Sequence, residues 1–201
     1  MSTKPSRKEQ THERILDAAA RALCRTGYQG VGVADVMKDA GLTHGGFYAH
    51  FESRDAMLAE AIRHAGREAV SLVWEEATAL LGKGMTPFRA LVEAYLSDRH
   101  LKAVELGCPV AALASEMWRQ NDEVRQASRE RVNQFVAAVQ EVLPADAPAQ
   151  SAYVVVSALV GTLQLARVLG PGKQSKAMRA ACIESLLVQY DRASMEDLSS
   201  A

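Results

Sequence analysis

The most constraining feature of the sequence is a pair of short helical segments joined by one glycine, directly after a longer helix. The longer helix is predicted over residues 8–25, where apolar residues recur at steps of three and four. Gly27 follows its end, and short helices are predicted over 33–40 and 44–50, with Gly41 between them. A glycine tolerates the left-handed backbone that such a tight turn requires. Three helices arranged in this way are the parts of a helix-turn-helix.

The rest of the chain also carries helical patterns. Ser53 is predicted to cap a long helix that reaches Leu81. Thr86, which Pro87 follows at the first helical position, is predicted to cap the next helix. Further helices are predicted over the ranges 86–101, 110–119, 122–142, 150–169 and 175–190. Aromatic residues make up only 5% of the chain, which favours helices over a sandwich or barrel.

The predicted fold is therefore all-α, with two parts. Residues 1–52 are expected to form a helix-turn-helix three-helix bundle for DNA binding, with a basic arm at 1–8. Residues 53–193 are expected to form a helical ligand-binding and dimerisation domain, and 194–201 a flexible tail.

Composition limits the class of protein. Apolar residues make up 48% of the 201 residues, enough for a proper core, and the net charge of −1 excludes a strongly basic nucleic-acid coat. Three scattered cysteines and the polar first eight residues predict a reduced, cytoplasmic protein without a secretory signal. The uncharged run over 151–166 is judged too short and too polar to span a membrane, so no membrane partner is expected.

The N-terminal quarter resembles the TetR family of bacterial regulators. The resemblance covers dense, ordered and correctly spaced residues: Ile15-Leu16-Asp17-Ala18-Ala19, Gly27-Tyr28, Val33-Ala34-Asp35-Val36, Ala40-Gly41-Leu42-Thr43, Gly45, Phe47-Tyr48 and His50-Phe51-Glu52-Ser53-Arg54. It departs from the family where Val31-Gly32 replace a helix-capping Ser or Thr, and where His44 replaces a frequent lysine. The resemblance implies a dimer that binds double-stranded DNA.

The short helix that starts at Thr43 is expected to enter the major groove, because recognition helices present their N-terminal residues to base edges. Two glycines there let the backbone approach the duplex closely. The resemblance implies that tyrosine and histidine positions after them reach phosphates, with basic residues as further phosphate contacts. The predicted DNA-binding residues are Thr43, His44, Gly45, Gly46, Tyr48, His50, Arg54 and Lys8.

The helix over 150–169 is apolar on nearly all sides and so needs burial on more than one face. A partner subunit would cover the second face in a four-helix interface with the last helix. The alternative is a wholly internal core helix. The interface is predicted to use Val156, Leu159, Val160, Leu163 and Leu187.

A small-molecule site is predicted among aromatic and methionine side chains of the second domain: Trp74, Tyr95, Met117 and Trp118. For each of these residues, ordinary core packing is the alternative. The most specific hypothesis is that Cys108 is a sensor cysteine, because Pro109 suits the first helical position and so places the Cys108 thiol at the helix N-terminus. The positive end of the helix dipole favours a thiolate there, as in cysteines that sense electrophiles. A small buried cysteine is the alternative.

The predicted function is a transcriptional repressor that binds a palindromic operator as a homodimer and is released by a small-molecule or thiol-reactive inducer. The alternative is a regulator that acts through a protein partner with a weak DNA head, because residues 1–50 carry only seven Lys/Arg against five Asp/Glu. An enzyme is not expected, since the five histidines show no metal-ligand spacing and no phosphate loop or nucleophile elbow occurs. No cofactor or metal is predicted.

Overall fold

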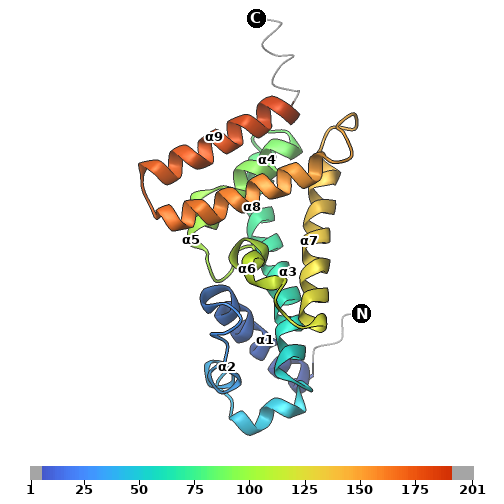
Figure 1. Cartoon of the computed structure of the whole chain (residues 1–201), viewed down its shortest axis with the longest axis vertical. Coiled ribbons are helices and arrows are strands. Elements are labelled where there is room, and N and C mark those ends of the chain that lie inside the picture. The colour runs from blue at the N-terminus through green and yellow to red at the C-terminus, as the bar shows by residue number, and fades with distance from the viewer. Residues whose placement is uncertain (1–5, 192–201) are drawn as a thin grey trace, which may run out of the picture. The chain divides into compact units, whose positions relative to one another are not determined.

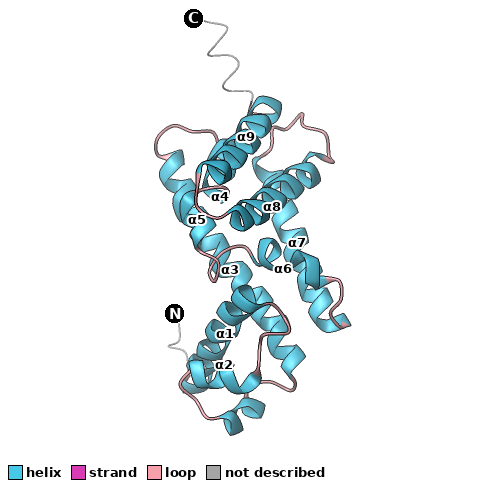
Figure 2. Ribbon diagram, turned by 60° about the vertical axis from the view of Figure 1, so that its left-hand side comes forward, coloured by secondary structure: helices cyan, strands magenta, loops and turns pink. Residues whose placement is uncertain are grey.

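A computed structural model describes residues 6–191 of the chain. Within that range all regular elements are helices, as predicted (Figure 2). They are α1 Arg7–Thr26, α2 Val33–Asp39, the 3-10 helix η1 His44–Ala49, α3 Arg54–Leu81, α4 Pro87–Tyr95, α5 Asp98–Lys102, α6 Pro109–Met117, α7 Asp122–Val142, α8 Ser151–Leu169 and α9 Lys173–Tyr190.

The chain forms two compact units. The first contains the segment up to Ala69 together with Val104–Arg131, and the second contains Val70–Ala103 together with the segment from Val132 onward. The expected boundary between residues 52 and 53 falls inside the first unit, because the first half of α3 supplies core residues to the head. The first five residues of the expected arm, and the expected tail at 194–201, lie outside the described residues.

The head begins with a well-capped helix. The Ser6 hydroxyl accepts the Glu9 N–H, and the Glu9 carboxylate accepts the Ser6 N–H, which together satisfy two N-terminal donors of α1. The apolar stripe of α1 is buried, as the periodicity predicted. Phe47 of η1 and Phe51 of the loop after it, whose rings stack at 5.6 Å, close the core.

Two glycines in the head hold backbone conformations that other residues adopt only with strain. Gly27 ends α1 at φ +72°, and Gly41 makes the turn between α2 and η1 at φ +69°. A Cβ on Gly27 would also lie only 2.7 Å from a carboxylate oxygen of Glu116. Both glycines therefore serve the turns that the sequence predicted for them.

In the second unit, α8 and α9 pack side by side (Figure 1). Thr86 caps α4 by accepting the Arg89 N–H, and Pro87 stands at the first helical position, as predicted. The single helix predicted over 86–101 is wrong, because the chain breaks after Tyr95 and restarts as α5. Ser97 accepts the His100 N–H and so acts as a second N-cap inside the predicted helix.

Helix α8 buries one face in the core of its unit. By length and composition alone it could cross a membrane, contrary to the prediction from the uncharged run, but a buried core helix passes the same test. Leu159 and Leu163 are 0% exposed within one chain, and Val156 is also buried. The prediction that these three residues form the dimer interface is therefore wrong, since they are already covered.

Candidate nucleic-acid interface

The segment from Thr43 to His50 lies at the surface of the head. Thr43 is the N-cap of η1, is exposed, and its side chain makes no capping hydrogen bond, so the hydroxyl is available to an external acceptor. His44 is exposed beside it, and the Tyr48 side chain is 74% exposed although its ring packs edge-on against buried Phe47. This segment, residues 43–50, is called the recognition wedge below.

The two glycines of the recognition wedge are not required by the packing of the head. A Cβ built on Gly45 meets no atom within 4 Å, and one built on Gly46 meets only Met37 Cε at 3.6 Å. Neither residue has a positive φ. A side chain of ordinary size would therefore fit the fold at position 45, and the surface at this point stays flat only because no side chain is present.

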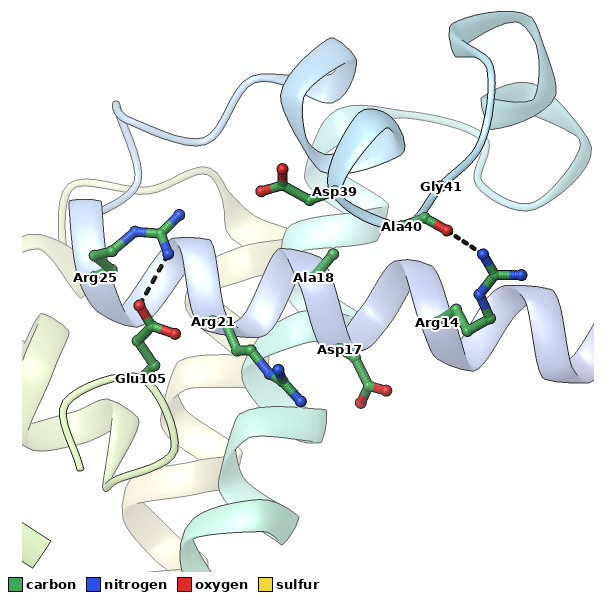
Figure 3. Close-up of a pocket in the computed structure, with 9 residues that line it drawn as sticks. All are labelled: Arg14, Asp17, Ala18, Arg21, Arg25, Asp39, Ala40, Gly41 and Glu105. Carbon is green, nitrogen blue, oxygen red and sulfur yellow. Dashed lines mark hydrogen bonds and ion pairs between the residues drawn. The ribbon is translucent and has the colours of Figure 1, made fainter.

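Helix α2 is held at both ends by arginines from the flanking helices. At its C-terminal end, Arg14 of α1 donates to the carbonyl of Ala40, as Figure 3 shows. At its N-terminal side, Arg54 donates from Nε to the carbonyl of Val31 at 3.0 Å and from Nη2 to the carbonyl of Tyr28. The arginines satisfy carbonyls that a helix end or loop leaves open.

The position of Arg54 corrects the sequence interpretation. It was expected to contact a DNA phosphate, but its guanidinium folds back onto two backbone carbonyls and also lies 3.7 Å from Asp55. These donors are committed inside the head. Arg54 is therefore assigned to holding the loop before α2, and Lys8, which is exposed near the start of α1, remains the basic residue predicted to contact phosphate.

The loop held by Arg54 is also fixed from two other helices of the first unit. The N–H of Tyr28 donates to the Glu116 carboxylate of α6 at 3.2 Å, and the Tyr28 hydroxyl lies 3.4 Å from the Ser128 hydroxyl of α7. The ring is buried, and this burial raises the pKa of Tyr28 to about 12. The loop that carries the chain from α1 to α2 is thus held on three sides.

The outer face of α1 borders an open cavity of about 480 Å³ (Figure 3). Arg21 and Arg25 line it opposite Asp39, and Arg25 is bound to Glu105 at 2.9 Å. Basic and acidic side chains alternate around this cavity, so it is not a uniformly positive surface. This cavity is therefore not assigned to a phosphate-binding surface.

Comparison with known proteins agrees with this geometry. A family model described as bacterial regulatory proteins, tetR family, matches residues 15–61, the range that contains α2 and the recognition wedge. An HTH-type transcriptional regulator of Mycobacterium tuberculosis is 26% identical over 170 residues, covering 78% of this chain and 84% of its own. The chain belongs to the TetR family. It is accordingly a DNA-binding transcriptional regulator and not an enzyme.

Solved structures show that the TetR fold extends beyond the matched segment. A TetR regulator from Chloroflexus aurantiacus aligns with a TM-score of 0.72 at 21% identity, covering 90% of this chain and 96% of its own. The regulator FadR from Bacillus subtilis, solved in complex with stearoyl-CoA, aligns with a TM-score of 0.64 at 17% identity, covering 87% and 97%. The second unit therefore has the C-terminal helical fold expected from the sequence.

The structure separates the residues predicted for a ligand site. Cys108, Met117 and Trp118 belong to the first unit, whereas Trp74 and Tyr95 belong to the second. Trp74 is 57% exposed and Trp118 64% exposed, so neither side chain is packed in the core of its unit. Tyr95 and Met117 are buried, which leaves the core-packing alternative open for both.

Cys108 occupies the helix position that the sequence predicted. It is the N-cap of α6, with Pro109 at the first helical position. Its side chain makes no capping hydrogen bond, and the residue is only 3% exposed. A reagent therefore has limited access to the thiol in this conformation.

Sequence reasoning missed several residues that support this TetR-type head. Arg14, Glu116 and His12 all carry polar side chains that contact another helix or loop of the first unit. Their local sequence does not distinguish them from ordinary surface residues, because a polar or charged residue on a helix normally faces solvent. Only the approach of segments far apart in the chain, such as Tyr28 and Glu116, reveals these contacts.

Proposed function

We propose that this TetR-family regulator is a repressor that binds a palindromic operator as a homodimer in the cytoplasm and leaves it when an inducer binds. The observation that carries the DNA part is the recognition wedge, whose exposed Thr43, His44 and Tyr48 surround a glycine that the fold itself does not need. The major groove admits a helix end, and a helix end without bulky side chains can approach the base edges closely. Tyr48 and His50 would meet phosphates beside it.

A gel shift tests the DNA part. The purified full chain is mixed at low salt with the DNA that lies upstream of its own gene, and retardation is expected. Tyr48→Ala is expected to weaken retardation about tenfold or more, because a phosphate contact is lost in each half-site. Trp118→Ala removes another strongly exposed aromatic side chain outside the recognition wedge and is expected to leave retardation unchanged.

The results separate the two hypotheses for this regulator. Retardation that disappears in Tyr48→Ala and persists in Trp118→Ala supports direct DNA binding through the recognition wedge. An unshifted fragment at low salt, or equal retardation by both variants, contradicts the proposal and favours a regulator that acts through a protein partner.

The dimer is proposed to form through the outer face of α8 and α9. On this face large apolar side chains stay exposed within one chain, most of all Val168 at 85% and Val188 at 73%. Tyr153, Val154 and Leu165 of α8 are also exposed. Several large apolar side chains exposed on one pair of packed helices support an interface there. Of the residues first predicted, Val160 and Leu187 are partly exposed and remain part of the proposal.

Sedimentation of the purified chain tests the dimer. Val168→Asp places a charge in the proposed apolar interface and is expected to shift the protein toward monomer. Val70→Asp, which alters a half-exposed valine on α3, is the matched control and is expected to stay dimeric. A wild-type monomer at micromolar concentration, or a Val168→Asp dimer of unchanged stability, contradicts this assignment.

Release by an inducer is proposed to act through α3, which runs without a break from the first unit into the second. A change in the direction of this helix would alter the separation of the two recognition wedges in the dimer. Operator half-sites lie about 34–36 Å apart, one helical turn, so a small change lowers affinity. The FadR complex shows that a protein of this fold holds an acyl-CoA, which supports an apolar small molecule as inducer.

A thiol-reactive inducer at Cys108 is proposed as the second route. Because the thiol is buried, modification requires that α6 first opens at its N-terminal end, and a bulky adduct then prevents it from closing. N-ethylmaleimide is expected to release wild-type protein from the upstream fragment and to spare Cys108→Ser. Equal release of both proteins would contradict this route, and release by apolar compounds alone would favour the small-molecule site.

A further inference from the structure

The ring of His50 ends the recognition wedge with one nitrogen inside the protein. The backbone N–H of His50 donates to the Phe47 carbonyl at 2.9 Å and closes η1. Its Nδ1 atom is buried and has no hydrogen-bond partner among the described residues. An N–H at that position would be left unsatisfied, whereas a lone pair costs less. The neutral ring with its proton on Nε2 is therefore the favoured form.

A second histidine stands beside this ring and is itself firmly held. His12 of α1 stacks on the Phe51 ring at 4.6 Å with an angle of 24°. Its Nε2 atom lies 2.9 Å from a carboxylate oxygen of Glu60 on α3. The centres of the His12 and His50 rings are 5.9 Å apart. His12 thus has little freedom to turn away from His50.

The positive groups beside His50 oppose its protonation. Lys8 and His12 of α1 are the positive residues near it. Glu60 of α3 is hydrogen-bonded to His12. Glu52 follows two residues along the chain and is exposed. Burial, and then the positive charges of His12 and Lys8, lower the pKa of His50 below its ordinary value of 6.5. Geometry and charge therefore act in the same direction.

We propose that His12 is a positioning residue for DNA binding, which holds His50 as a neutral ring with Nε2–H as its single donor toward a phosphate oxygen. The proposal rests on the proposed function, since it takes His50 to be a phosphate contact. It adds that this contact needs no proton uptake at neutral pH. The positive charge for DNA binding then comes from Lys8 and other basic residues, and His50 contributes a directional hydrogen bond from Nε2–H.

The decisive measurement is the titration of the histidine ring signals by NMR in the full chain without DNA. His12→Gln keeps an amide donor for Glu60 but carries no charge. One charge at 5.9 Å in a water-like medium changes a titration midpoint by about half a pH unit, so the His50 midpoint is expected to rise by about that amount. His64→Gln removes the other histidine that pairs α3 with α1, through Asp17 at 2.7 Å, and is expected to leave His50 unchanged.

Affinity for DNA against pH is the second readout. As the pH is lowered, the affinity of both proteins for DNA is expected to rise once His50 takes up a proton, because the phosphate stabilises the charged ring. In His12→Gln this rise is expected to begin at a higher pH than in wild type. His44 is the same in both proteins, so its contribution cancels in the comparison. If His12 served only to pack Phe51, the variant would bind more weakly at every pH with an unchanged profile.

The outcomes distinguish this inference from the proposed function. An equal His50 midpoint in wild type and in folded His12→Gln, or a wild-type midpoint at the ordinary value, overturns the role of His12. Failure to bind DNA at any pH overturns the proposed function, and the phosphate role of His50 with it, while the ring titration still decides whether His12 sets the state of His50. A raised midpoint together with an earlier rise in affinity supports the proposal.

Discussion

Gly45 is the position where one added methyl group is expected to move protein stability and DNA affinity in opposite directions. The fold leaves open space at the place a Cβ would take, and the backbone there does not have the positive φ that resists a side chain. The Gly45→Ala variant is therefore expected to fold normally. In the proposed complex, however, the same space is occupied by a base edge.

The two effects have estimable sizes. Replacing glycine by alanine at a compatible backbone position stabilises a protein by about 0.4–1 kcal/mol, chiefly because the unfolded chain loses freedom. A methyl group that prevents one good base contact costs about 1–3 kcal/mol in each half-site. Affinity is thus expected to fall about tenfold or more, since 1.4 kcal/mol corresponds to a factor of ten.

Urea unfolding and fluorescence anisotropy with a labelled operator fragment measure the two quantities. Gly172→Ala, at another open glycine outside the head, is the control and is expected to leave DNA affinity unchanged. Gly41→Ala is expected instead to lower stability by about 1–2 kcal/mol, because its φ is +69°. Unchanged affinity of a stable Gly45→Ala protein would refute the idea that position 45 meets the duplex.

Three further predictions concern ionisable residues. Lys8→Ala should weaken binding to all DNA sequences alike and reduce the slope of log affinity against log salt by about one per head, as seen in a salt titration. Arg14→Ala should lower the free energy of unfolding by about 1 kcal/mol in urea, because the Ala40 carbonyl loses its donor. Burial lowers the pKa of His100 to about 4, so between pH 6.5 and 4 the unfolded chain binds a proton that the folded chain does not. Stability should therefore fall as pH drops through this window, by about 2 kcal/mol at pH 5 from this group, and His100→Gln should lose correspondingly less.

Local signals were sufficient where a structure depends on neighbours in the chain. The positive φ of Gly27 and Gly41, and the caps at Ser53 and Thr86, depend on residues within one helical turn, and all four predictions are confirmed. The third helix was placed correctly but is a 3-10 helix. Ser97 has the same capping chemistry as Thr86, so its hydroxyl is a local signal that predicts the break between α4 and α5.

Contacts between distant segments escaped the sequence analysis for a physical reason. An arginine at the start of a helix has the same local pattern whether it meets a phosphate or a carbonyl, so the role of Arg54 depended on the loop that folds beside it. Helix α8 is apolar all round, and such a pattern does not show which stripe faces its own unit. The predicted interface took Leu159 and Leu163, whereas the exposed stripe contains Val168.

Protection of guanine N7 atoms in selected DNA tests the central claim most directly. Duplexes that the purified chain retains from a random-sequence pool are methylated with and without protein, which reports occupancy of the major groove. We expect an inverted repeat with protected N7 atoms in two half-sites about one helical turn apart, and loss of that protection in a Thr43→Ala, Tyr48→Ala double variant. Retained DNA without a shared sequence, or N7 protection that survives both substitutions, would contradict the account.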